Sequence, residues 1–266
     1  MNEVLVTGIG PVSSIGIGRK EFAQGIIEQR SGLSPLSLFA ADHATAEVRD
    51  LNLETILPSQ KTYLDRAAEF ALAAAQLALN DAGLTRESYN RWRAGVVVGS
   101  EYGCLGTMQR FTSTLQQKGA RLANPLLFSH TYVNTPTSLC SIEFNLAGHH
   151  GTFAGRSAGR QALDSALEAL QLDRADMLVV IGVDVISEPL YRSLLAEGLL
   201  GDDAMGEGAC AFVLETSSHA AQRGAGGQPV DGGSIDGTHL RAQLGQTFAA
   251  EPFFALAQRL LAAVSA

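Results

Sequence analysis

Four stretches of the chain are almost continuously apolar and rich in β-branched residues, which is typical of buried strands. They cover residues 4–10, 94–99, 177–185 and 209–214. A strand without polar alternation has both of its faces covered. The pattern therefore predicts a sheet with helices on both sides, and an α/β fold.

Helical periodicity fills most of the intervals between these strands. The clearest case is residues 64–82, where Asp65 stands in the first turn and Gly83 follows as a stop signal. Residues 45–53 are ambiguous and fit an edge strand, and residues 124–148 are irregular up to a more regular stretch at 138–146. Further helices are expected at 21–29, 103–118, 155–170 and 240–263, and the Gly-rich stretch 224–237 is the best linker.

Composition narrows the class of protein. The 266 residues are 46% hydrophobic, which is enough for a real core and excludes a disordered chain. There are 27 acidic against 19 basic residues and no basic run, so nucleic acid is not expected as the main ligand. Apolar stretches fall short of the roughly 20 residues that span a bilayer, and Glu3 stands where a secretion signal would carry a cation. We expect a soluble, cytoplasmic protein without membrane insertion.

The candidate metal ligands and cofactor motifs do not combine into a site. Cys104, Cys140 and Cys210 are far apart and lack partners at ligand spacing, so we expect small buried residues rather than a disulfide framework or a zinc site. The adjacent pair His149 and His150 has no third ligand nearby in the sequence. The glycines after the first strand do not follow the dinucleotide-binding spacing. No metal and no cofactor are predicted.

Residues 155–159 loosely resemble a nucleophile elbow. They read Gly-Arg-Ser-Ala-Gly, so Ser157 is offset from the G-x-S-x-G spacing. A hydrolase would also need a base, and His219 or His239 could supply it, although neither follows an obvious strand. The plainer interpretation is a glycine-containing start of a helix. An acyltransferase or hydrolase that uses Ser157 stays open as an alternative.

Several short strings occur in a fixed order between residues 4 and 225. They are residues 6–16, 30–33, 65–68, 74–83, 95–100, 145–148, 175–184 and 206–209. Their order and spacing resemble those of β-ketoacyl-acyl-carrier-protein synthases of the thiolase fold. The resemblance implies a layered αβαβα fold whose first half is retained at residues 1–225 and whose second half is largely deleted. Residues 226–266 would then be a linker and a remnant of the second half's terminal helix.

The resemblance places other residue types at the family's catalytic positions. Ketosynthases carry an acyl-accepting cysteine at a helix N-terminus. Matching that helix to residues 159–163 puts Arg156 there, beside Ser157, or Gly155 if the alignment is shifted by one residue. The family's later lysine and histidine correspond to Arg241 and Gln246 in residues 240–248. Arginine cannot carry an acyl thioester. These four residues are therefore interpreted as vestigial positions, and no catalytic residue is predicted.

The resemblance then implies a function without catalysis. A chain of this kind is similar to chain length factors of type II polyketide systems, including truncated ones beside ketosynthases in aryl polyene biosynthesis. It would pair as a heterodimer with an active β-ketoacyl-ACP synthase, in polyketide or fatty-acid-like biosynthesis, and would meet the acyl carrier protein indirectly. Its side chains would set the floor of the acyl tunnel. A purely structural pseudoenzyme stays open.

Two groups of residues are expected to serve this role. Residues at i, i+3, i+7 and i+10 of helix 103–118 share one face, which is either a core stripe or, by the resemblance, the tunnel wall. Deletion of the second half should also expose apolar faces that a partner covers. We expect Arg156 to pair with a carboxylate such as Glu101 or with a backbone carbonyl. The tunnel residues are Leu105, Met108, Phe111, Thr112 and Leu115, and the interface residues are Tyr132, Val133, Asn134 and Phe153.

Overall fold

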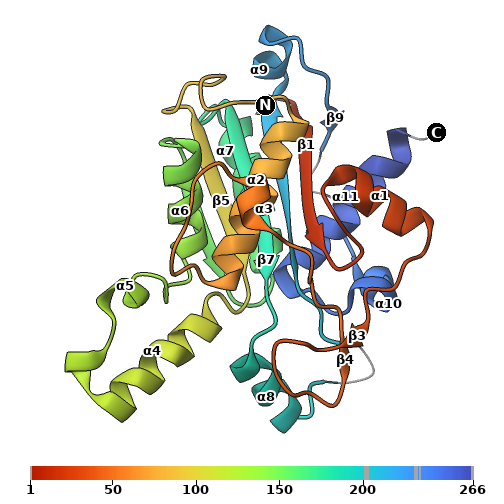
Figure 1. Cartoon of the computed structure of the whole chain (residues 1–266). Helices are drawn as coiled ribbons and strands as arrows, with labels where there is room; N and C mark the ends of the chain where they lie inside the picture. Colours follow the sequence, from red (N-terminus) through yellow and green to blue (C-terminus); the bar gives the residue numbers. More distant parts are fainter. Residues whose placement is uncertain (1, 201–203, 231–232, 234, 265–266) are drawn as a thin grey trace.

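A mixed sheet forms the centre of the molecule (Figure 1). The computed structural model describes residues 2–200, 204–230, 233 and 235–264. The strand order is β2-β1-β8-β7-β5-β6, with β9 also paired to β1. β5, β6 and β7 are parallel to one another, whereas β8 runs antiparallel to β1 and β7. The strands are β1 (Val4–Ser13), β2 (Gly16–Ile17), β5 (Ala94–Ser100), β6 (His150–Ala154), β7 (Met177–Asp184), β8 (Gly208–Thr216) and β9 (Gln228–Pro229).

Helices cover both faces of this sheet, and a small hairpin of β3 (Ser34–Pro35) and β4 (Ala44–Thr45) lies apart from it. α3 and α6 lie on one face, and α7 and α11 on the other. The helices are α1 (Arg19–Ile27), α2 (Leu53–Ile56), α3 (Arg66–Asp81), α4 (Leu105–Lys118), α5 (Pro125–Phe128), α6 (Thr135–Phe144), α7 (Ala158–Gln171), α8 (Glu188–Ala196), α9 (Ser217–Gln222), α10 (Arg241–Leu244) and α11 (Glu251–Val264), with 3-10 turns η1 (Ala120–Leu122), η2 (Thr238–Leu240) and η3 (Phe248–Ala250).

The alternation of side chains along each strand produces two separate cores. Val96 and Val98 of β5 pack with α3 and α6, whereas Val97 packs with α7 and α11. All residues of β5, β7 and β8 are buried, which confirms the sheet covered on both sides that the apolar runs predicted. The three cysteines are free and buried, as expected.

Two glycines of the opening string lie within β1 and allow a close approach of helix α3. A methyl group on Gly10 would lie 2.1 Å from the carbonyl oxygen of Ala74, and one on Gly8 would lie 2.2 Å from that of Ala78. Only glycine permits the helix and the strand to approach this closely. These glycines therefore serve packing inside a strand rather than a turn.

The C-terminal segment differs from its prediction as one helix over residues 240–263. It consists of η2, α10, an irregular stretch, η3 and α11. Gly245 has a φ of +63°, a left-handed conformation that ends α10. Buried apolar residues stand on both sides of the break, Leu244 before it and Ala249 after it, so the apolar pattern did not reveal the break. The prediction of a continuous helix was therefore wrong.

Two other stretches also differ from their predictions. Residues 45–53 contribute only one residue to the two-residue strand β4, and α2 then begins at Leu53. The edge strand predicted over this stretch does not form. Residues 124–148 contain α5 and α6, and the unpredicted strand β6 follows directly. β6 pairs only with β5 among the described strands and forms one edge of the sheet.

The C-terminal segment packs into the same body as the rest of the chain. Phe253 of α11 stacks on Phe212 of β8 at 5.5 Å between ring centroids, and Phe254 stacks on Phe22 of α1 at 5.6 Å. The predicted boundary at residue 225 stays a prediction, and part of the predicted linker, at 231, 232 and 234, lies outside the described residues. None of the described helices is long and apolar enough to cross a membrane.

Candidate functional site

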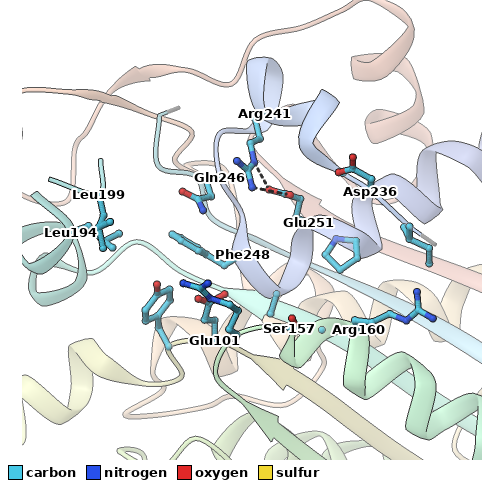
Figure 2. Close-up of a pocket in the computed structure, with 17 residues that line it drawn as sticks. Glu101, Ser157, Arg160, Leu194, Leu199, Asp236, Arg241, Gln246, Phe248 and Glu251 are labelled. Carbon is cyan, nitrogen blue, oxygen red and sulfur yellow. Dashed lines mark hydrogen bonds and ion pairs between the residues drawn. The ribbon is translucent and has the colours of Figure 1, made fainter. Parts of the chain in front are cut away.

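A pocket of about 440 Å³ lies at the carboxyl ends of the parallel strands. Glu101 and Tyr102 follow β5, Arg156 and Ser157 follow β6, and Asp184 ends β7 behind the wall. In α/β sheets, ligands commonly bind at this end of the strands. The C-terminal segment closes the opposite side, as Figure 2 shows for Arg241, Gln246 and Phe248.

The four residues interpreted as vestigial positions meet around this pocket. Arg156 and Ser157 lie at the turn before α7, whereas Arg241 and Gln246 come from the C-terminal segment. Residues about 85 positions apart in the sequence thus line one cavity. Their grouping is an observation, and their role as remnants of an active site stays a prediction.

Ser157 occupies a sharp turn between strand and helix. Its φ is 67° and its ψ is 14°, and Gly155 two residues earlier has a φ of 90°. A serine on a strand–turn–helix corner in a strained conformation has the geometry of a nucleophile elbow. The sequence spacing suggested only a loose likeness, so the structure strengthens that alternative. No histidine, lysine or cysteine is found among the described residues that line the pocket, so no base of these types adjoins Ser157 there.

The candidate bases named for Ser157 are engaged elsewhere. His219 contacts the Glu215 carboxylate, with 2.6 Å between Nδ1 and Oε2, and belongs to α9. The ring of His239 contacts Gln258 Oε1 at 2.6 Å and lies in a neighbouring groove. Neither residue lines the pocket that contains Ser157.

Arg156 does not make the contact expected of it. It is exposed and lines the pocket together with Glu101, but it forms no hydrogen bond or ion pair with any described residue. The expected pairing with Glu101 or a backbone carbonyl is therefore wrong. A cation at a pocket rim keeps most of its hydration, so it needs no protein partner.

Arg241 is neutralised within the pocket wall. Its Nε lies 2.8 Å from Oε2 of Glu251, and a second nitrogen lies 3.1 Å from Oε1, which gives a two-point ion pair (Figure 2). The backbone of Gln246 is fixed by hydrogen bonds to Ala204 and Gly206. These contacts hold the C-terminal segment against the loop before β8.

Three residues of this region were not singled out by sequence reasoning. The rings of Tyr102 and Phe248 meet edge to face, and Asp184 accepts hydrogen bonds behind them. Burial, with the nearby Glu101 and Asp184 carboxylates, raises the pKa of Tyr102 to about 12. Burial also raises the pKa of Asp184 to about 6, against the opposing effect of its backbone donors. The sequence signal that could have identified Asp184 is an acidic residue at the end of an otherwise apolar strand.

The proposed tunnel residues do not form a buried stripe. Met108 is 46% exposed, Leu115 is 38% exposed, and Thr112 is also exposed, whereas Leu105 and Phe111 are half-buried. Leu105 packs against a small core cluster beside α8, so the interpretation as an ordinary core stripe holds for Leu105 and is wrong for Met108, Thr112 and Leu115. Their role as a tunnel wall stays a prediction.

The helix that carries these residues extends away from the sheet together with α5 (Figure 1). We call residues 105–134 the arm. Phe111, Phe128 and Tyr132 form a row of ring contacts along it, with centroids 5.2 and 5.1 Å apart. Of the predicted interface residues, Tyr132 and Asn134 are exposed and Val133 is half-buried in the arm, and Phe153 is half-buried on the edge strand β6.

Comparison with known proteins identifies the family. The model described as "Beta-ketoacyl synthase, N-terminal domain" matches residues 1–220. A 3-oxoacyl-[acyl-carrier-protein] synthase 2 of Synechocystis sp. is 28% identical over 247 residues. The match covers 84% of this chain and 59% of that synthase. The ketoacyl synthase alpha subunit of the tetracenomycin polyketide synthase of Streptomyces glaucescens is 28% identical over 256 residues, with the same coverage.

Solved structures show the same fold. The ishigamide ketosynthase/chain length factor superimposes with a TM-score of 0.75 at 23% identity, over 85% of this chain and 61% of that chain. A β-ketoacyl synthase from Burkholderia phymatum gives a TM-score of 0.74 at 23% identity, over 85% and 62%. The thiolase-like fold is thus confirmed, and the chain spans about three fifths of the length of these relatives. The chain belongs to the β-ketoacyl synthase family, through its match to the family's N-terminal domain.

Proposed function

We propose that this chain is a cytoplasmic, non-catalytic partner subunit that pairs with an active β-ketoacyl-ACP synthase and shapes the tunnel for the growing acyl chain. The observation that carries the proposal is the composition of the pocket. The positions that correspond to the acyl acceptor and its polarising groups surround one cavity, yet they are occupied by arginine, serine and glutamine. Condensation needs an activated nucleophile and groups that polarise the thioester.

The arm supports the pairing. Leu122 is 64% exposed and Leu126 is 59% exposed, next to the row of rings that ends at Tyr132. Several exposed apolar side chains on one projecting segment are typical of an interaction site. The open edge of β6 offers unpaired backbone groups nearby in the fold, because Phe153 and its neighbours pair only with β5 among the described strands.

The charge of the arm indicates what the partner surface should carry. Residues 102–142 contain no aspartate or glutamate, although the whole chain has a net charge of -8. Within this stretch Arg110, Lys118 and Arg121 are all exposed. A partner with acidic side chains around an apolar centre would complement this surface.

Copurification tests the pairing directly. The chain is produced alone and together with an intact β-ketoacyl-ACP synthase from the same organism, and the masses of the assemblies are measured by light scattering. We expect a stable complex of the two proteins, and an insoluble or self-associated chain when it is produced alone. A monodisperse monomer that stays separate from the synthase would overturn the pairing.

The elbow geometry of Ser157 favours one second candidate, an acyltransferase or hydrolase acting through this serine. The chain is incubated with an acyl thioester and with a fluorophosphonate probe, and intact mass is measured for the natural chain and for Ser157→Ala. A mass increase that Ser157→Ala abolishes would support the enzyme. We expect no increase, because no histidine or lysine is found among the described lining residues.

A further inference from the structure

The Asp184 carboxylate joins three segments that are far apart in the sequence. It is fully buried and accepts four hydrogen bonds, and no described residue forms an ion pair with it. Ser100 Oγ lies 2.9 Å from Oδ1, and the backbone nitrogens of Glu101 and Tyr102 lie 3.0 Å from Oδ2 and Oδ1. The backbone nitrogen of Ala249 lies 2.9 Å from Oδ2. The four donors are the last residue of β5, two residues of the loop that follows it, and one residue of η3.

On one side the contacts continue to the arm. Ser100 Oγ also accepts a hydrogen bond from the backbone nitrogen of Gly103, at 2.8 Å. Gly103 has a φ of +60°, and a methyl group there would lie 3.1 Å from Cγ2 of Val133. Helix α4 begins two residues later, at Leu105. The loop that Asp184 holds therefore fixes the start of α4 and contacts Val133, near the C-terminal end of the arm in the sequence.

On the other side the contacts continue to the pocket wall. Phe248, which precedes Ala249, has a φ of 50° and meets Tyr102 with ring centroids 4.9 Å apart. The backbone of Ala249 packs tightly against β7, because a methyl group on Gly182 would lie 2.5 Å from the carbonyl oxygen of Ala249. The left-handed conformation of a phenylalanine is costly and persists only where its surroundings determine it.

We propose that Asp184 is a positioning residue that joins the pocket wall formed by the C-terminal segment to the base of the arm. Through its carboxylate the two regions keep one mutual arrangement. The coupling is a property of this chain by itself. Its use in presenting the arm to a partner rests on the proposed function.

A second buried carboxylate provides a matched control. Asp65 caps α3 through the backbone nitrogen of Ala67 at 2.8 Å, and also accepts from the backbone nitrogen of Thr107 in α4 at 3.3 Å. It thus holds the first turn of α4 and forms no hydrogen bond or ion pair with the described part of the C-terminal segment. Ser100→Ala is the other control, because it removes the link to Gly103 and leaves the backbone donors around Asp184 in place.

Hydrogen–deuterium exchange on the full chain tests the coupling. The natural chain, Asp184→Asn, Ser100→Ala and Asp65→Asn are compared in the same assembly state, over segments 101–108 and 246–251. Asparagine has one acceptor oxygen, so two of the four donors lose their partner. We expect Asp184→Asn to speed exchange about ten-fold or more in both segments, and both controls to do so only in 101–108. Acceleration in a single segment for Asp184→Asn would overturn the proposal.

The pH profile separates this role from general packing. A carboxyl with a pKa of about 6 when buried, and near 3.8 when opened to water, favours the closed arrangement as pH falls. Between pH 7 and pH 5 the opening of both segments should therefore decrease about ten-fold in the natural chain, after correction for intrinsic exchange. The titratable groups around Asp184 are Glu101 and Tyr102, from whose backbone nitrogens it accepts hydrogen bonds. Arg156 lies near Tyr102, and the Glu207–Arg66 and Glu251–Arg241 pairs lie on neighbouring segments.

These other groups are present in Asp184→Asn as well, so that variant should show no such pH dependence. An equal pH dependence in Asp184→Asn would assign the effect to another group and overturn the proposal. If this variant does not fold, the profile of the natural chain together with Ser100→Ala decides, and a flat natural profile counts against it. The measurement uses the soluble state that the natural chain adopts, self-associated or in the complex, and that state is the same for all variants. Its outcome therefore does not depend on the result of the copurification test.

Discussion

The ring of Tyr102 meets the ring of Phe248 at 83°, with 4.9 Å between their centroids, and so connects the loop after β5 to the C-terminal segment. Edge-to-face pairs of this kind stabilise a fold by about 0.5–1.5 kcal/mol beyond the area they bury. The contact is made by a phenylalanine in a left-handed conformation. Packing in this wall of the pocket therefore outweighs local backbone strain.

Phe248 gives a prediction with an unusual order of variants. Phe248→Ala removes the ring contact and should lower the free energy of unfolding by about 2 kcal/mol, since the side chain is half-buried. Phe248→Gly removes the same ring but relieves the positive φ, so it should be as stable as the alanine variant or more stable by up to about 1 kcal/mol. Urea unfolding at neutral pH measures both. If Phe248→Gly were clearly less stable than Phe248→Ala, the backbone strain at position 248 would be contradicted.

Gly10 should tolerate no side chain. A methyl group there would overlap the carbonyl of Ala74, so Gly10→Ala must displace α3 from β1 and should cost about 3 kcal/mol or more. Gly226→Ala is the matched control, because nothing lies within 4 Å of the added carbon. Thermal unfolding should show a large shift for the first variant and almost none for the second. Equal shifts would contradict the close helix–strand approach.

Glu215 should make stability depend on acid pH. Burial alone would raise its pKa, but hydrogen bonds from His219, Arg223 and Thr7 outweigh burial and lower the pKa to about 2 from an ordinary 4.5. A depressed pKa gives stability that is present above about pH 4.5 and lost as pH falls toward 2. The side chain is fully buried, so the loss amounts to about 3 kcal/mol.

Urea unfolding at pH 7, 4 and 3 follows the first part of this loss, which amounts to about 2 kcal/mol by pH 3. Glu215→Gln should be destabilised at pH 7, because Arg223 loses its buried charged partner, and should lack the further decline in acid. Glu54→Gln, at an exposed site on α2, is the control and should behave like the natural chain. A variant at 215 that declines with pH as steeply as the natural chain would place the titration elsewhere.

Restoring a thiol should not restore condensation. Arg156→Cys, and Ser157→Cys at the position with the positive φ, each place a thiol in the pocket, yet Arg241 stays paired with Glu251 and Gln246 stays in place of a histidine. We expect no acyl-enzyme and no ketoacyl product above background by mass spectrometry with acyl- and malonyl-carrier proteins. Arg156→Ala is the control. Product from either cysteine variant would contradict the proposed inactivity.

Chain length should respond to the arm. If α4 lines the tunnel, Thr112→Trp shortens the product of the complex, and Met108→Ala or Phe111→Ala lengthens it, because the wall gains or loses volume. Gln117→Ala, on the opposite face of the helix, is the control. The product distribution is measured by mass spectrometry and normalised to intact complex. An unchanged distribution in all three variants, with the complex preserved, would mean that the tunnel ends elsewhere.

The apolar strands could be predicted because burial on both faces leaves a continuous pattern, as in β5 and β7. The strand β6 could not, because it lies at an edge and its His150, Gly151 and Thr152 give no apolar run. The break at Gly245 was hidden for a related reason. Apolar residues continue on both sides of it, and only the positive φ of the backbone shows that the helix ends.

The candidate site was partly predictable for reasons of a different kind. The family resemblance named Arg156, Ser157, Arg241 and Gln246, and the fold brings them together although no local pattern connects the two pairs. The contact between Asp184 and Ala249 spans 65 positions and involves a backbone donor, which leaves no trace in the residue types. The exposure of Met108 also could not be inferred, because helical spacing is the same for a core stripe and an interface.

The absence of carboxylates in residues 102–142 gives the molecule an electrical polarity. Three cations and no carboxylate lie on this projecting stretch, while the acidic excess lies on the remaining body, so the molecule carries a dipole that points along the arm (Figure 1). In the field of an acidic protein such a dipole orients before contact, and encounters with the arm foremost become more frequent. If the proposed partner docks at the arm, its association should be fast at low ionic strength and should slow as salt screens the field.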